Sequence, residues 1–429
     1  MKIIGIDIGT TSICALEADG ETGNIIKSLS YPNEAFIRGE KSFEKLQDPA
    51  VIMSTVERLL SSLDLSNAAA IGFSGQMHGI LYVDKNGNAV SLLYTWQDER
   101  GAQLYTDGKS YAEALGCFPG YGLATDLYNE KNGLIPDEAD TLCTVADYAA
   151  MRLCGETSPL VHITNAASLG CFDIEKSRFK CDNPRLPKVV SDFEIVGKFK
   201  GIPVCVAVGD NQASFIGSVK SSNAALINVG TGSQISRLTD NPNCKGVEIR
   251  PFDGKRYLAA GCSLCGGRAF AMVEKLFREA VKEAIGECES FYPVLDRLLS
   301  SKENTDLSAD CRFCGTRDEP MLRGGLFGIS ESNFTVSDIA LAVLVGMTKE
   351  LYDMYALSGG GADEIVCSGN GVRKNPALQR VIRRIFNAEI KIPLYEEEAA
   401  YGAALSAGTA CGMFSDIDAA RERIRYTEA

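Results

Sequence analysis

An acidic residue lies inside an apolar segment near the start of the chain, and the presence of a carboxylate there needs an explanation. The segment IIGIDIGTTS, residues 3–12, places Asp7 among isoleucines and ends in a glycine and two threonines. Burying a carboxylate without a partner is costly. Asp7 therefore indicates a hydrogen-bond network, a bound metal ion or a structural role, although the segment also fits an ordinary strand and turn.

The same pattern returns about half a chain later. Residues 225–236, ALINVGTGSQIS, again join an apolar segment through a glycine turn to a second segment. Both stretches predict β-hairpins, because tight turns use the tolerance of glycine for positive φ. A motif repeated at half-length predicts two similar domains facing each other, with ligands held between them.

Tight glycine turns can bind phosphate, because their backbone N–H groups converge on an anion. Residues 363–369, DEIVCSG, predict a strand that leads to a third glycine turn, with a helix N-terminus behind it. The sequence has neither a GxxxxGK[ST] loop nor a strand-linked GxGxxG. The three glycine turns are therefore the candidates for binding a nucleotide.

Strands that alternate with helices position these turns and predict an α/β protein. Helices are expected over 49–63, 141–155, 211–219, 266–284, 337–357 and 375–386. The last of these should have Asn375 as its cap and Pro376 as its first residue. Buried strands are expected over 68–76 and 202–210, and residues 301–325 are expected to form a long loop.

Composition narrows the class of protein. The 429 residues carry a net charge of −13, which argues against a nucleic-acid partner. No apolar run reaches the roughly 18 residues of a membrane span, and no signal-peptide core follows Met1. Fifteen cysteines indicate a reducing compartment, so a cytoplasmic protein with free thiols is expected. The pairs Cys262/Cys265 and Cys311/Cys314 leave a zinc site as the alternative to packed thiols.

Six motifs occur in an order that resembles the FGGY carbohydrate kinases of the actin-like ATPase superfamily. They are IIGIDIGTTS, GFSGQMHGILYVD, YTWQDER, VAVGDNQAS, INVGTGSQIS and EIVCSGNGVRKNPALQRVI. The likeness covers essentially the whole chain. It implies two actin-like (ribonuclease H-like) α/β domains across a catalytic cleft. Residues 1–218 would bind the sugar and supply the catalytic base, and residues 219–429 would bind ATP.

Within this family, SGQMHG with TWQD and GDNQ resembles ketose kinases, namely xylulokinases and sedoheptulokinases. The segments TWQD, SLCGGRAFAMVEKLF and CGTRDEPMLRGGLFGIS resemble sedoheptulokinases more than xylulokinases, whereas GDNQ is mixed. The implied reaction moves the γ-phosphoryl of Mg·ATP to the terminal hydroxyl of a ketose, sedoheptulose in preference to D-xylulose. An actin-like nucleotide switch that binds protein shares the hairpins, but it has no need of the sugar motifs. The expected partners are a sugar and ATP, and the sequence leaves a homodimer open.

The resemblance also assigns roles to residues. Asp210 falls on the catalytic base, and Asp7 falls near the reacting phosphate and Mg²⁺, which it would hold through water. The implied nucleotide-binding residues are Gly9, Thr10, Thr11, Gly230, Thr231, Gly232, Gly267, Gly369, Asn370 and Asn375. The implied sugar-binding residues are Gln76, Met77, His78, Trp96, Asp98, Asp210 and Asn211.

Simpler roles remain open for some of these residues. Asp210 directly precedes a predicted helix, so it also fits a helix N-cap, and as a base a carboxylate with an ordinary pKa of about 4 is expected to suffice. Asp98 is expected to accept a hydrogen bond from a sugar hydroxyl. A solvated salt bridge between Asp98 and Arg100 is the alternative. The histidine outside the sugar motif, His162, is expected to be structural.

Overall fold

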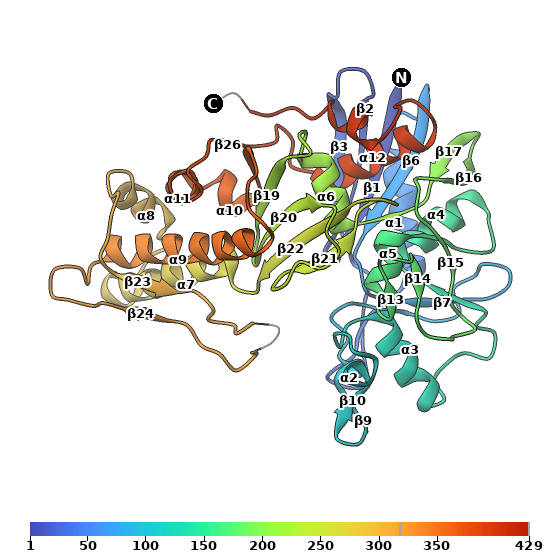
Figure 1. The fold of residues 1–429 in the computed structure, drawn as a ribbon, viewed down its shortest axis with the longest axis horizontal. Helices are drawn as coiled ribbons and strands as arrows, with labels where there is room; N and C mark the ends of the chain where they lie inside the picture. The colour runs from blue at the N-terminus through green and yellow to red at the C-terminus, as the bar shows by residue number, and fades with distance from the viewer. Residues whose placement is uncertain (317–318, 428–429) are drawn as a thin grey trace. The chain divides into compact units, whose positions relative to one another are not determined.

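In a computed structural model of the protein, which describes residues 1–316 and 319–427, the chain folds into two compact units (Figure 1). Unit 1 contains residues 1–220, 250–257 and 397–425. Unit 2 contains residues 221–249 and 258–396, together with the end of the chain from Tyr426. The units therefore do not follow a single boundary after residue 218, because two later segments return to unit 1.

The longer returning segment contains helix α12, Glu398–Ala410, which lies against strands β1 and β6 of unit 1 (Figure 1). Two glycines make this approach close. A Cβ on Gly5 would lie 1.8 Å from the carbonyl oxygen of Ala400, and one on Gly72 would lie 1.9 Å from that of Ala403. Small residues on both sides of the contact thus explain why the C-terminal helix belongs to the first unit.

The main sheet of unit 1 has the strand order β16-β17-β6-β1-β2-β3, with β18 also paired to β6. Strand β1 is antiparallel to β2 and parallel to β6, which confirms the hairpin predicted around Gly9. The strands are β1 Lys2–Ile8, β2 Ser12–Asp19, β3 Ile25–Pro32, β6 Ala68–Gly75, β16 Ile195–Phe199, β17 Ile202–Cys205 and β18 Val208–Gly209. The predicted strand over 202–210 is thus two short strands followed by a helix.

Helices and short strands surround this sheet. The helices are α1 Pro49–Ser61, α2 Tyr111–Leu115, α3 Gly122–Lys131, α4 Val145–Cys154, α5 Ile163–Ser168, α6 Asp210–Ser218 and α13 Ile417–Arg421. The short strands are β4 Phe36–Arg38, β5 Lys45–Gln47, β7 Leu81–Val83, β8 Leu93–Tyr94, β9 Leu104–Thr106, β10 Lys109–Ser110, β11 Thr141–Cys143, β12 Leu160–His162, β13 Phe172–Asp173, β14 Arg178–Phe179 and β15 Lys188–Val190.

One predicted helix of unit 1 starts later than expected. Residues 141–143 form strand β11, and α4 begins only at Val145. The reason is a capping box, in which the Thr144 side chain accepts a hydrogen bond from the Asp147 N–H and the Asp147 carboxylate accepts one from the Thr144 N–H. The helix ends at Gly155 in a left-handed conformation, as the sequence predicts.

The main sheet of unit 2 has the strand order β21-β22-β20-β19-β25-β26. Strand β19 is antiparallel to β20 and parallel to β25, so it repeats the arrangement of β1 with β2 and β6. The strands are β19 Ala224–Val229, β20 Ser233–Thr239, β21 Glu248–Pro251, β22 Tyr257–Ser263, β25 Glu364–Ser368 and β26 Ile390–Lys391. The hairpin predicted around Gly230 is confirmed.

The helices of unit 2 are α7 Gly266–Ile285, α8 Tyr292–Leu299, α9 Val336–Leu357, α10 Asn370–Arg373 and α11 Pro376–Phe386. Asn375 caps α11 as predicted, because its side chain accepts a hydrogen bond from the Leu378 N–H. The segment expected as a loop over 301–325 contains strand β23, Ser308–Asp310, which pairs with β24, Gly325–Phe327. Residues 317 and 318 of this segment lie outside the described part of the chain.

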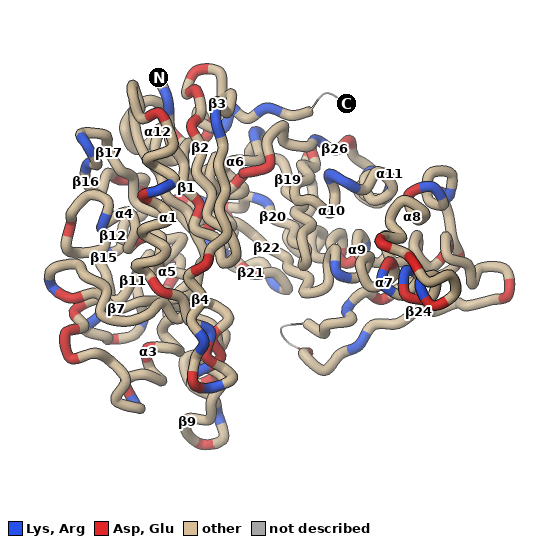
Figure 2. Tube along the Cα trace, turned by 180° about the vertical axis from the view of Figure 1, so that it is seen from behind, with Lys and Arg blue, Asp and Glu red and all other residues tan. Residues whose placement is uncertain are grey.

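Acidic and basic residues are interspersed over the chain (Figure 2). Among the described helices, none combines the length and the apolar character that a membrane crossing requires. All fifteen cysteines are free thiols. Within residues 1–316 and 319–427, no group of three or more His, Cys, Asp or Glu side chains is arranged to hold a metal ion.

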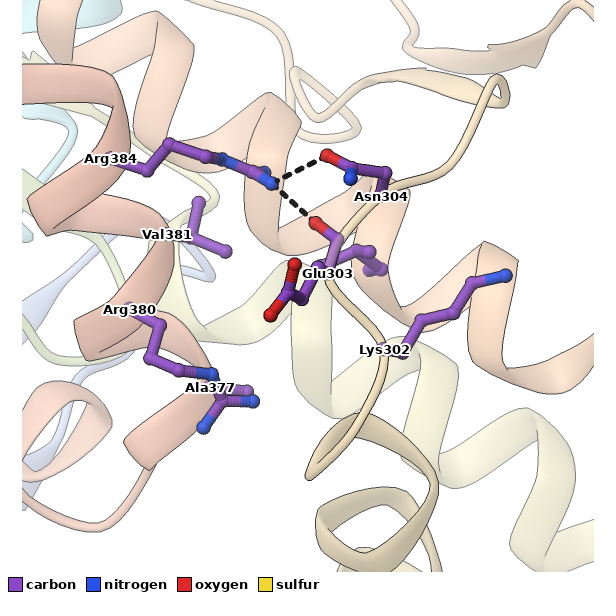
Figure 3. Close-up of a pocket in the computed structure, with 8 residues that line it drawn as sticks. Lys302, Glu303, Asn304, Ala377, Arg380, Val381 and Arg384 are labelled. Carbon is purple, nitrogen blue, oxygen red and sulfur yellow. Dashed lines mark hydrogen bonds between the residues drawn. The ribbon is translucent and has the colours of Figure 1, made fainter.

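Unit 2 also contains a cavity of about 320 Å³ beside α11, which none of the predicted site residues lines (Figure 3). Its cationic side chains already bind other groups of the protein. Arg384 donates to the Asn304 side chain at 3.1 Å and to the Glu303 carbonyl, and Arg380 donates to the Leu299 carbonyl at 2.6 Å. These bonds hold the segment after α8 against α11, so the arginines have a structural role here.

Candidate active site

Three strand ends of unit 1 bring the two predicted catalytic carboxylates to one edge of the sheet. Asp7 of β1 lies opposite Ser74 of β6, and Val208 of β18 lies opposite the same serine. Asp210 follows two residues later as the first residue of α6. Gly209, not Asp210, is the N-cap, so the N-cap interpretation of Asp210 is corrected by one position.

Both carboxylates are harder to ionise than ordinary aspartates. Burial, and then the negative charge of Asp7, raise the pKa of Asp210 to about 7, against the opposing effects of Arg250 and the Asn211 N–H. Burial also raises the pKa of Asp7 to about 6, although the Ser74 hydroxyl donates to Asp7 Oδ1 at 2.6 Å. The sequence argument required no more than an ordinary carboxylate pKa of about 4 for the base, and the pKa of Asp210 lies above that value.

This edge of the sheet suits a divalent cation. A positive charge near Asp7 and Asp210 would offset both the burial and the mutual repulsion that raise their pKa values. Mg²⁺ is commonly held by one or two carboxylates, with water and substrate phosphates completing its ligands. The carboxylates present therefore fit Mg²⁺ shared with a phosphate group.

Protein donors hold the first glycine turn, residues 9–11, through its carbonyl oxygens. Asn33 donates from its side chain to the Gly9 carbonyl and from its N–H to the Thr11 carbonyl, both at 2.9 Å. Gln47 donates to the Thr10 carbonyl, also at 2.9 Å. A turn fixed in this way can direct its N–H groups toward an anion.

The predicted sugar-binding residues of the SGQMHG motif directly follow β6. The Gln76 N–H donates to the Ile8 carbonyl at 2.9 Å, which ties this motif to the end of β1. Met77 lies against Gly209, because a Cβ on Gly209 would be 2.9 Å from the Met77 sulfur. The tertiary structure thus brings the motif next to the start of α6, where Asp210 is located.

His78 is held in a fixed orientation. Its Nδ1 lies 2.8 Å from the Ser168 carbonyl oxygen, which can only accept a hydrogen bond, so Nδ1 must donate. The ring stacks on Tyr121 with 4.4 Å between the ring centroids. The backbone of His78 has a φ of 73°, in the region that favours glycine, and such strain is typical of residues that serve a site.

Several buried side-chain amide oxygens in unit 1 have no hydrogen-bond partner among the described residues. They are Gln76 Oε1, Asn165 Oδ1, Asn211 Oδ1 and Gln212 Oε1. Unpaired buried acceptors are costly, so a ligand hydroxyl or a water molecule is their expected partner. The sequence predicted Gln76 and Asn211, but it assigned no role to Gln212, although that residue belongs to the GDNQ motif, or to Asn165, which lies three residues after His162.

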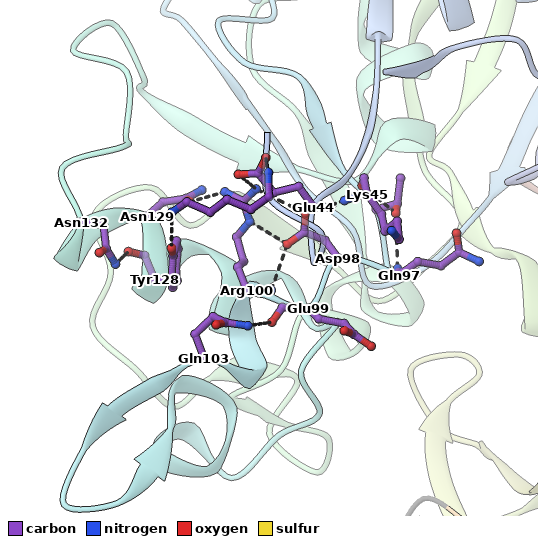
Figure 4. A network of polar contacts seen from close by, with 12 residues as sticks. Glu44, Lys45, Gln97, Asp98, Glu99, Arg100, Gln103, Tyr128, Asn129 and Asn132 are labelled. Carbon is purple, nitrogen blue, oxygen red and sulfur yellow. Dashed lines mark hydrogen bonds and ion pairs between the residues drawn. The ribbon is translucent and has the colours of Figure 1, made fainter. Parts of the chain in front are cut away.

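The structure does not support the prediction that Asp98 contacts the sugar, because Asp98 is bound by other residues of the protein (Figure 4). Its side chain is fully buried, and Arg100 Nε donates to Asp98 Oδ1 at 2.6 Å. The Lys45 N–H donates to Asp98 Oδ2 at 3.0 Å. Both carboxylate oxygens of Asp98 therefore already accept hydrogen bonds from the protein. The structure shows the alternative, an ion pair with Arg100, but this pair is buried and not solvated.

The chain's single tryptophan links two predicted sites. Trp96 is about half exposed, and its Nε1 donates to the Thr10 hydroxyl at 2.9 Å. Thr10 lies in the predicted phosphate turn, whereas Trp96 was predicted to contact the sugar. The indole face remains available for packing against a ligand, because only its ring nitrogen is engaged in this bond.

His162 is structural, as the sequence predicts. It is fully buried and caps α5. Its Nε2 lies 3.1 Å from the Ser191 carbonyl oxygen, and its Nδ1 lies 3.0 Å from the Thr164 hydroxyl oxygen. Burial lowers the pKa of His162 to about 4, so the ring is neutral at physiological pH.

In unit 2 the second glycine turn is held by the N-terminus of α7. The Gly267 N–H donates to the Gly230 carbonyl and the Arg268 N–H to the Thr231 carbonyl, both at 3.0 Å. A Cβ on Gly266 would lie 2.4 Å from the carbonyl carbon of Gly232. Glycine at this helix start is therefore required for the contact with the turn.

The third glycine turn lies next to the second. Gly369 has a φ of 85°, and a Cβ on it would lie 2.5 Å from the Val229 carbonyl oxygen. Asn370 is the first residue of α10, and the Asn375 side-chain oxygen is occupied by its helix cap. Unit 2 therefore gathers the predicted nucleotide-binding glycines of the second and third turns, whereas Asn375 can offer a ligand only its amide nitrogen.

The two Cys-x-x-Cys pairs do not act as two intact pairs. Cys262 donates to Gln234 Oε1 at 3.3 Å. Cys265 is the N-cap residue of α7 and interacts with the partly exposed Cys314, whose sulfur accepts from Arg268 at 3.5 Å. The first pair is therefore split between different neighbours, as expected of packed thiols.

Comparison with known proteins agrees with this arrangement. Residues 2–217 match the model of the FGGY family of carbohydrate kinases, N-terminal domain. Mouse sedoheptulokinase is 26% identical, with 94% of this chain and 96% of the relative covered. The xylulose kinase of Staphylococcus epidermidis is 27% identical, with 98% of this chain and 90% of the relative covered.

Solved structures share the fold over the whole chain. The ligand-bound xylulose kinase from Lactobacillus acidophilus superposes with a TM-score of 0.84 at 20% identity, covering 100% of this chain and 93% of the other. The gluconate kinase from the same organism has a TM-score of 0.85 at 20% identity, with 100% and 92% covered. These are sugar kinases with the actin-like two-domain fold. With half of the sequence matched by the family model, the chain belongs to the FGGY family of carbohydrate kinases, which are phosphotransferases with an alcohol as acceptor.

Proposed function

We propose that this protein transfers the γ-phosphoryl group of ATP to the terminal hydroxyl of a ketose, namely sedoheptulose, with D-xylulose as the second candidate. Sugar kinases of this family use ATP, usually with a divalent metal ion. The observation that carries the proposal is the pair Asp7 and Asp210 at one sheet edge, with unpaired amide acceptors from the same unit.

Asp210 is the proposed catalytic base. The attacking hydroxyl must lose its proton as the new O–P bond forms, and a carboxylate beside it can accept that proton. The raised pKa of Asp210 makes it a stronger base than an ordinary aspartate, at the cost that more of it is protonated below pH 7. The start of α6, next to Met77, fixes the direction of its side chain.

Asp7 is the proposed residue for the cation. Mg²⁺ held there, through water, would offset the charge of the transferring phosphoryl group. The turn of residues 9–11 would contact the phosphates with its N–H groups and with the Thr11 side chain, which is exposed. The reaction requires the γ-phosphate of the nucleotide to reach the Asp7 and Asp210 carboxylates.

Sugar recognition is proposed for residues of unit 1. Gln76 Oε1 and Asn211 Oδ1 would accept hydrogen bonds from sugar hydroxyls, since both oxygens lack a protein partner. Trp96 would pack its ring against the apolar face of the sugar. Asn165 and Gln212 join this set as additional acceptors, whereas Asp98 leaves it.

Nucleotide binding is proposed for unit 2. The turn Gly230–Thr231–Gly232, with Gly267 behind it, would bind phosphates through backbone N–H groups, and Gly369 with Asn370 would receive the adenosine. Close backbone packing at Gly266, Gly267 and Gly369 supports this assignment, because it fixes the two turns whose N–H groups would meet the nucleotide. Fifteen free thiols support a reducing compartment, such as the cytoplasm.

An ADP-release assay over a panel of sedoheptulose, D-xylulose, ribulose and glycerol tests the proposal. We expect the highest kcat/KM for sedoheptulose, and about a 10²- to 10⁴-fold lower kcat for Asp210→Asn, the range that general bases supply. Gln103→Met, at a partly exposed glutamine outside the proposed site, is the control and should keep the wild-type kcat. Release of ADP without any sugar, unchanged in Asp210→Asn, would contradict the kinase and favour a nucleotide switch.

A further inference from the structure

A three-residue strand, β5, connects the segments that carry the proposed site. It pairs with β8, which leads into the Trp96 segment. The Lys45 N–H donates to Asp98, and the Lys45 carbonyl accepts from the Thr95 N–H and hydroxyl, at 3.0 and 2.9 Å (Figure 4). The ion pair between Asp98 and Arg100 thus serves to hold the Trp96 segment against β5.

The last residue of this strand, Gln47, joins the other two segments. Its side chain is fully buried. Gln47 Nε2 donates to the Thr10 carbonyl at 2.9 Å, and Gln47 Oε1 accepts from Gln76 Nε2 at 2.8 Å. One bond needs a donor and the other needs an acceptor, so an amide satisfies both ends and neither a carboxylate nor an apolar group does.

The bond to Gln76 determines how that residue meets a ligand. Because its amide nitrogen is engaged with Gln47, its amide oxygen is the end left without a protein partner. A sugar hydroxyl that bonds this oxygen therefore acts on a side chain already connected, through Gln47, to the phosphate turn. Amide hydrogen bonds in a series polarise one another, which strengthens the connection.

We propose that Gln47 is a positioning residue that holds the phosphate turn of residues 9–11 and the sugar acceptor Gln76 in one fixed arrangement, so that the two substrates bind synergistically. This rests on the proposed function, because it assigns Gln76 to the sugar and the turn to the nucleotide. Gln47 contacts neither substrate itself.

Asn33 provides the comparison that separates positioning from simple support. It also donates to a carbonyl of the same turn, that of Gly9, and it is also buried. Its side-chain oxygen accepts from the Ala35 N–H at 3.3 Å, so no bond leads from it to Gln76. Loss of Asn33 loosens the turn, whereas loss of Gln47 also separates the turn from the sugar acceptor.

The chain supplies its own reporter for the turn. Trp96 is the only tryptophan, and its ring nitrogen bonds the Thr10 hydroxyl. Tryptophan emission therefore responds to the position of Thr10 when the nucleotide analogue is added without sugar. This readout needs neither turnover nor knowledge of the sugar.

The experiment uses wild type, Gln47→Met, Gln76→Met, the double variant and Asn33→Leu, with Gln103→Met as a control. Gln103 is a partly exposed glutamine whose amide bonds only the Glu99 carbonyl. Thermal unfolding first selects variants that fold. Trp96 emission and the Kd of a non-hydrolysable ATP analogue are then measured with and without sedoheptulose.

In wild type we expect sedoheptulose to lower the nucleotide Kd about tenfold, within the usual range of coupling between sites. Gln47→Met should reduce this ratio to near one and lower kcat about tenfold to 10²-fold, as a misplaced reactive group does. Asn33→Leu should weaken nucleotide binding but keep the ratio, and Gln103→Met should change neither. Equal behaviour of Gln47→Met and Asn33→Leu would overturn the proposal.

The double variant separates this proposal from the proposed function. With the nucleotide analogue alone, Gln76→Met should shift Trp96 emission in the wild-type background and should add nothing in Gln47→Met. Additive shifts overturn the positioning role even if the protein is a sedoheptulose kinase. Non-additive shifts support it even if no ketose in the panel is phosphorylated, an outcome that would refute only the proposed function.

Discussion

The two glycine hairpins occupy the same place in their units, but they differ at one decisive position. Asp7 of β1 lies opposite Ser74 of the parallel strand β6, and Asn228 of β19 lies opposite Ser368 of β25. Ser74 donates to Asp7 at 2.6 Å, and Asn228 donates to the Ser368 hydroxyl at 2.8 Å. An acid in one unit is therefore replaced by a neutral amide in the other.

The two turns are also held by different means. Side chains of Asn33, Gln47 and Trp96 bind the turn in unit 1, whereas the backbone of α7 binds the turn in unit 2. Side-chain amides can transmit a change at one ligand to another segment. Backbone contacts between glycines fix a rigid surface. This difference is in keeping with the proposal that unit 1 performs the chemical step and unit 2 holds the nucleotide.

Exchanging the acid and the amide should have the largest effect. Asp7→Asn should lower kcat on the order of 10²-fold or more, because an electrostatic partner of the phosphoryl group is lost. Asn228→Asp should mainly raise the KM for ATP, because it adds a negative charge near the proposed phosphate site. Steady-state kinetics with varied ATP separate these effects.

The combined variant Asp7→Asn/Asn228→Asp tests whether the acid can act from the equivalent position of unit 2. If the acid is needed only in unit 1, moving it to the equivalent position of unit 2 leaves the protein as inactive as Asp7→Asn alone. Recovery of activity in the combined variant would show that the two hairpins are interchangeable.

Alanine in place of Gly266, at the start of α7, should have the next largest effect, a loss of stability in unit 2. A Cβ on Gly266 would lie 2.4 Å from Gly232, so Gly266→Ala should destabilise unit 2 by about 1–3 kcal/mol, the usual cost of overpacking. Gly230→Ala is the matched control, since its Cβ would meet its nearest atom only at 4.0 Å. Denaturant unfolding measures both, and an equal cost at the two sites would contradict rigid docking of the turn.

The pH dependence of activity should report the acidic pair of unit 1. Burial and the charge of Asp7 raise the pKa of Asp210 to about 7, so the free protein loses the ionised base as the pH falls below 7. We expect kcat/KM for the sugar, which reports the free enzyme, to fall about tenfold per pH unit below that value. Activity that stays constant down to a pH of about 4 would indicate an ordinary aspartate.

The last prediction concerns the pH dependence of stability and also distinguishes the units, because both histidines lie in unit 1. Burial lowers the pKa of His162 from 6.5 to about 4 in the folded state. Between these values the unfolded chain binds the proton and the folded one does not. The stabilising effect of neutral His162 is therefore complete above pH 6.5 and is lost as the pH falls toward 4.

Wild type should thus lose up to about 1.4 kcal/mol per pH unit within this window relative to His162→Gln. Trp96 fluorescence in denaturant titrations follows unit 1 specifically. Parallel stability curves for the two proteins between pH 6.5 and 4 would contradict a buried neutral ring. The comparison cancels the titration of the carboxylates that both proteins share.

Local sequence determined the hairpins, the alternation of strands and helices and several helix ends of this protein. Neither Gly9 nor Gly230 adopts the positive φ on which the hairpins were predicted; at Gly9 the close Ser12 carbonyl oxygen, 2.8 Å from where a Cβ would lie, requires glycine instead. Asn375 caps α11 through a bond three residues away, and apolar spacing sets which face is buried. These features depend on neighbours in the chain, so the residues that produce them are visible in the sequence. The carbohydrate-kinase motifs are likewise short contiguous segments.

The tertiary structure alone decided which polar residues are paired within the fold and which are left without a protein partner. Asp98 is paired with Arg100 and with the Lys45 backbone, a segment more than fifty residues earlier. The raised pKa of Asp210 comes from burial and from Asp7, two hundred residues away. Gln47 lies in none of the recognised motifs, yet its side chain connects the Thr10 carbonyl to the Gln76 side chain. Burial, charge and hydrogen bonding act through space, so they depend on which distant segments the fold brings together.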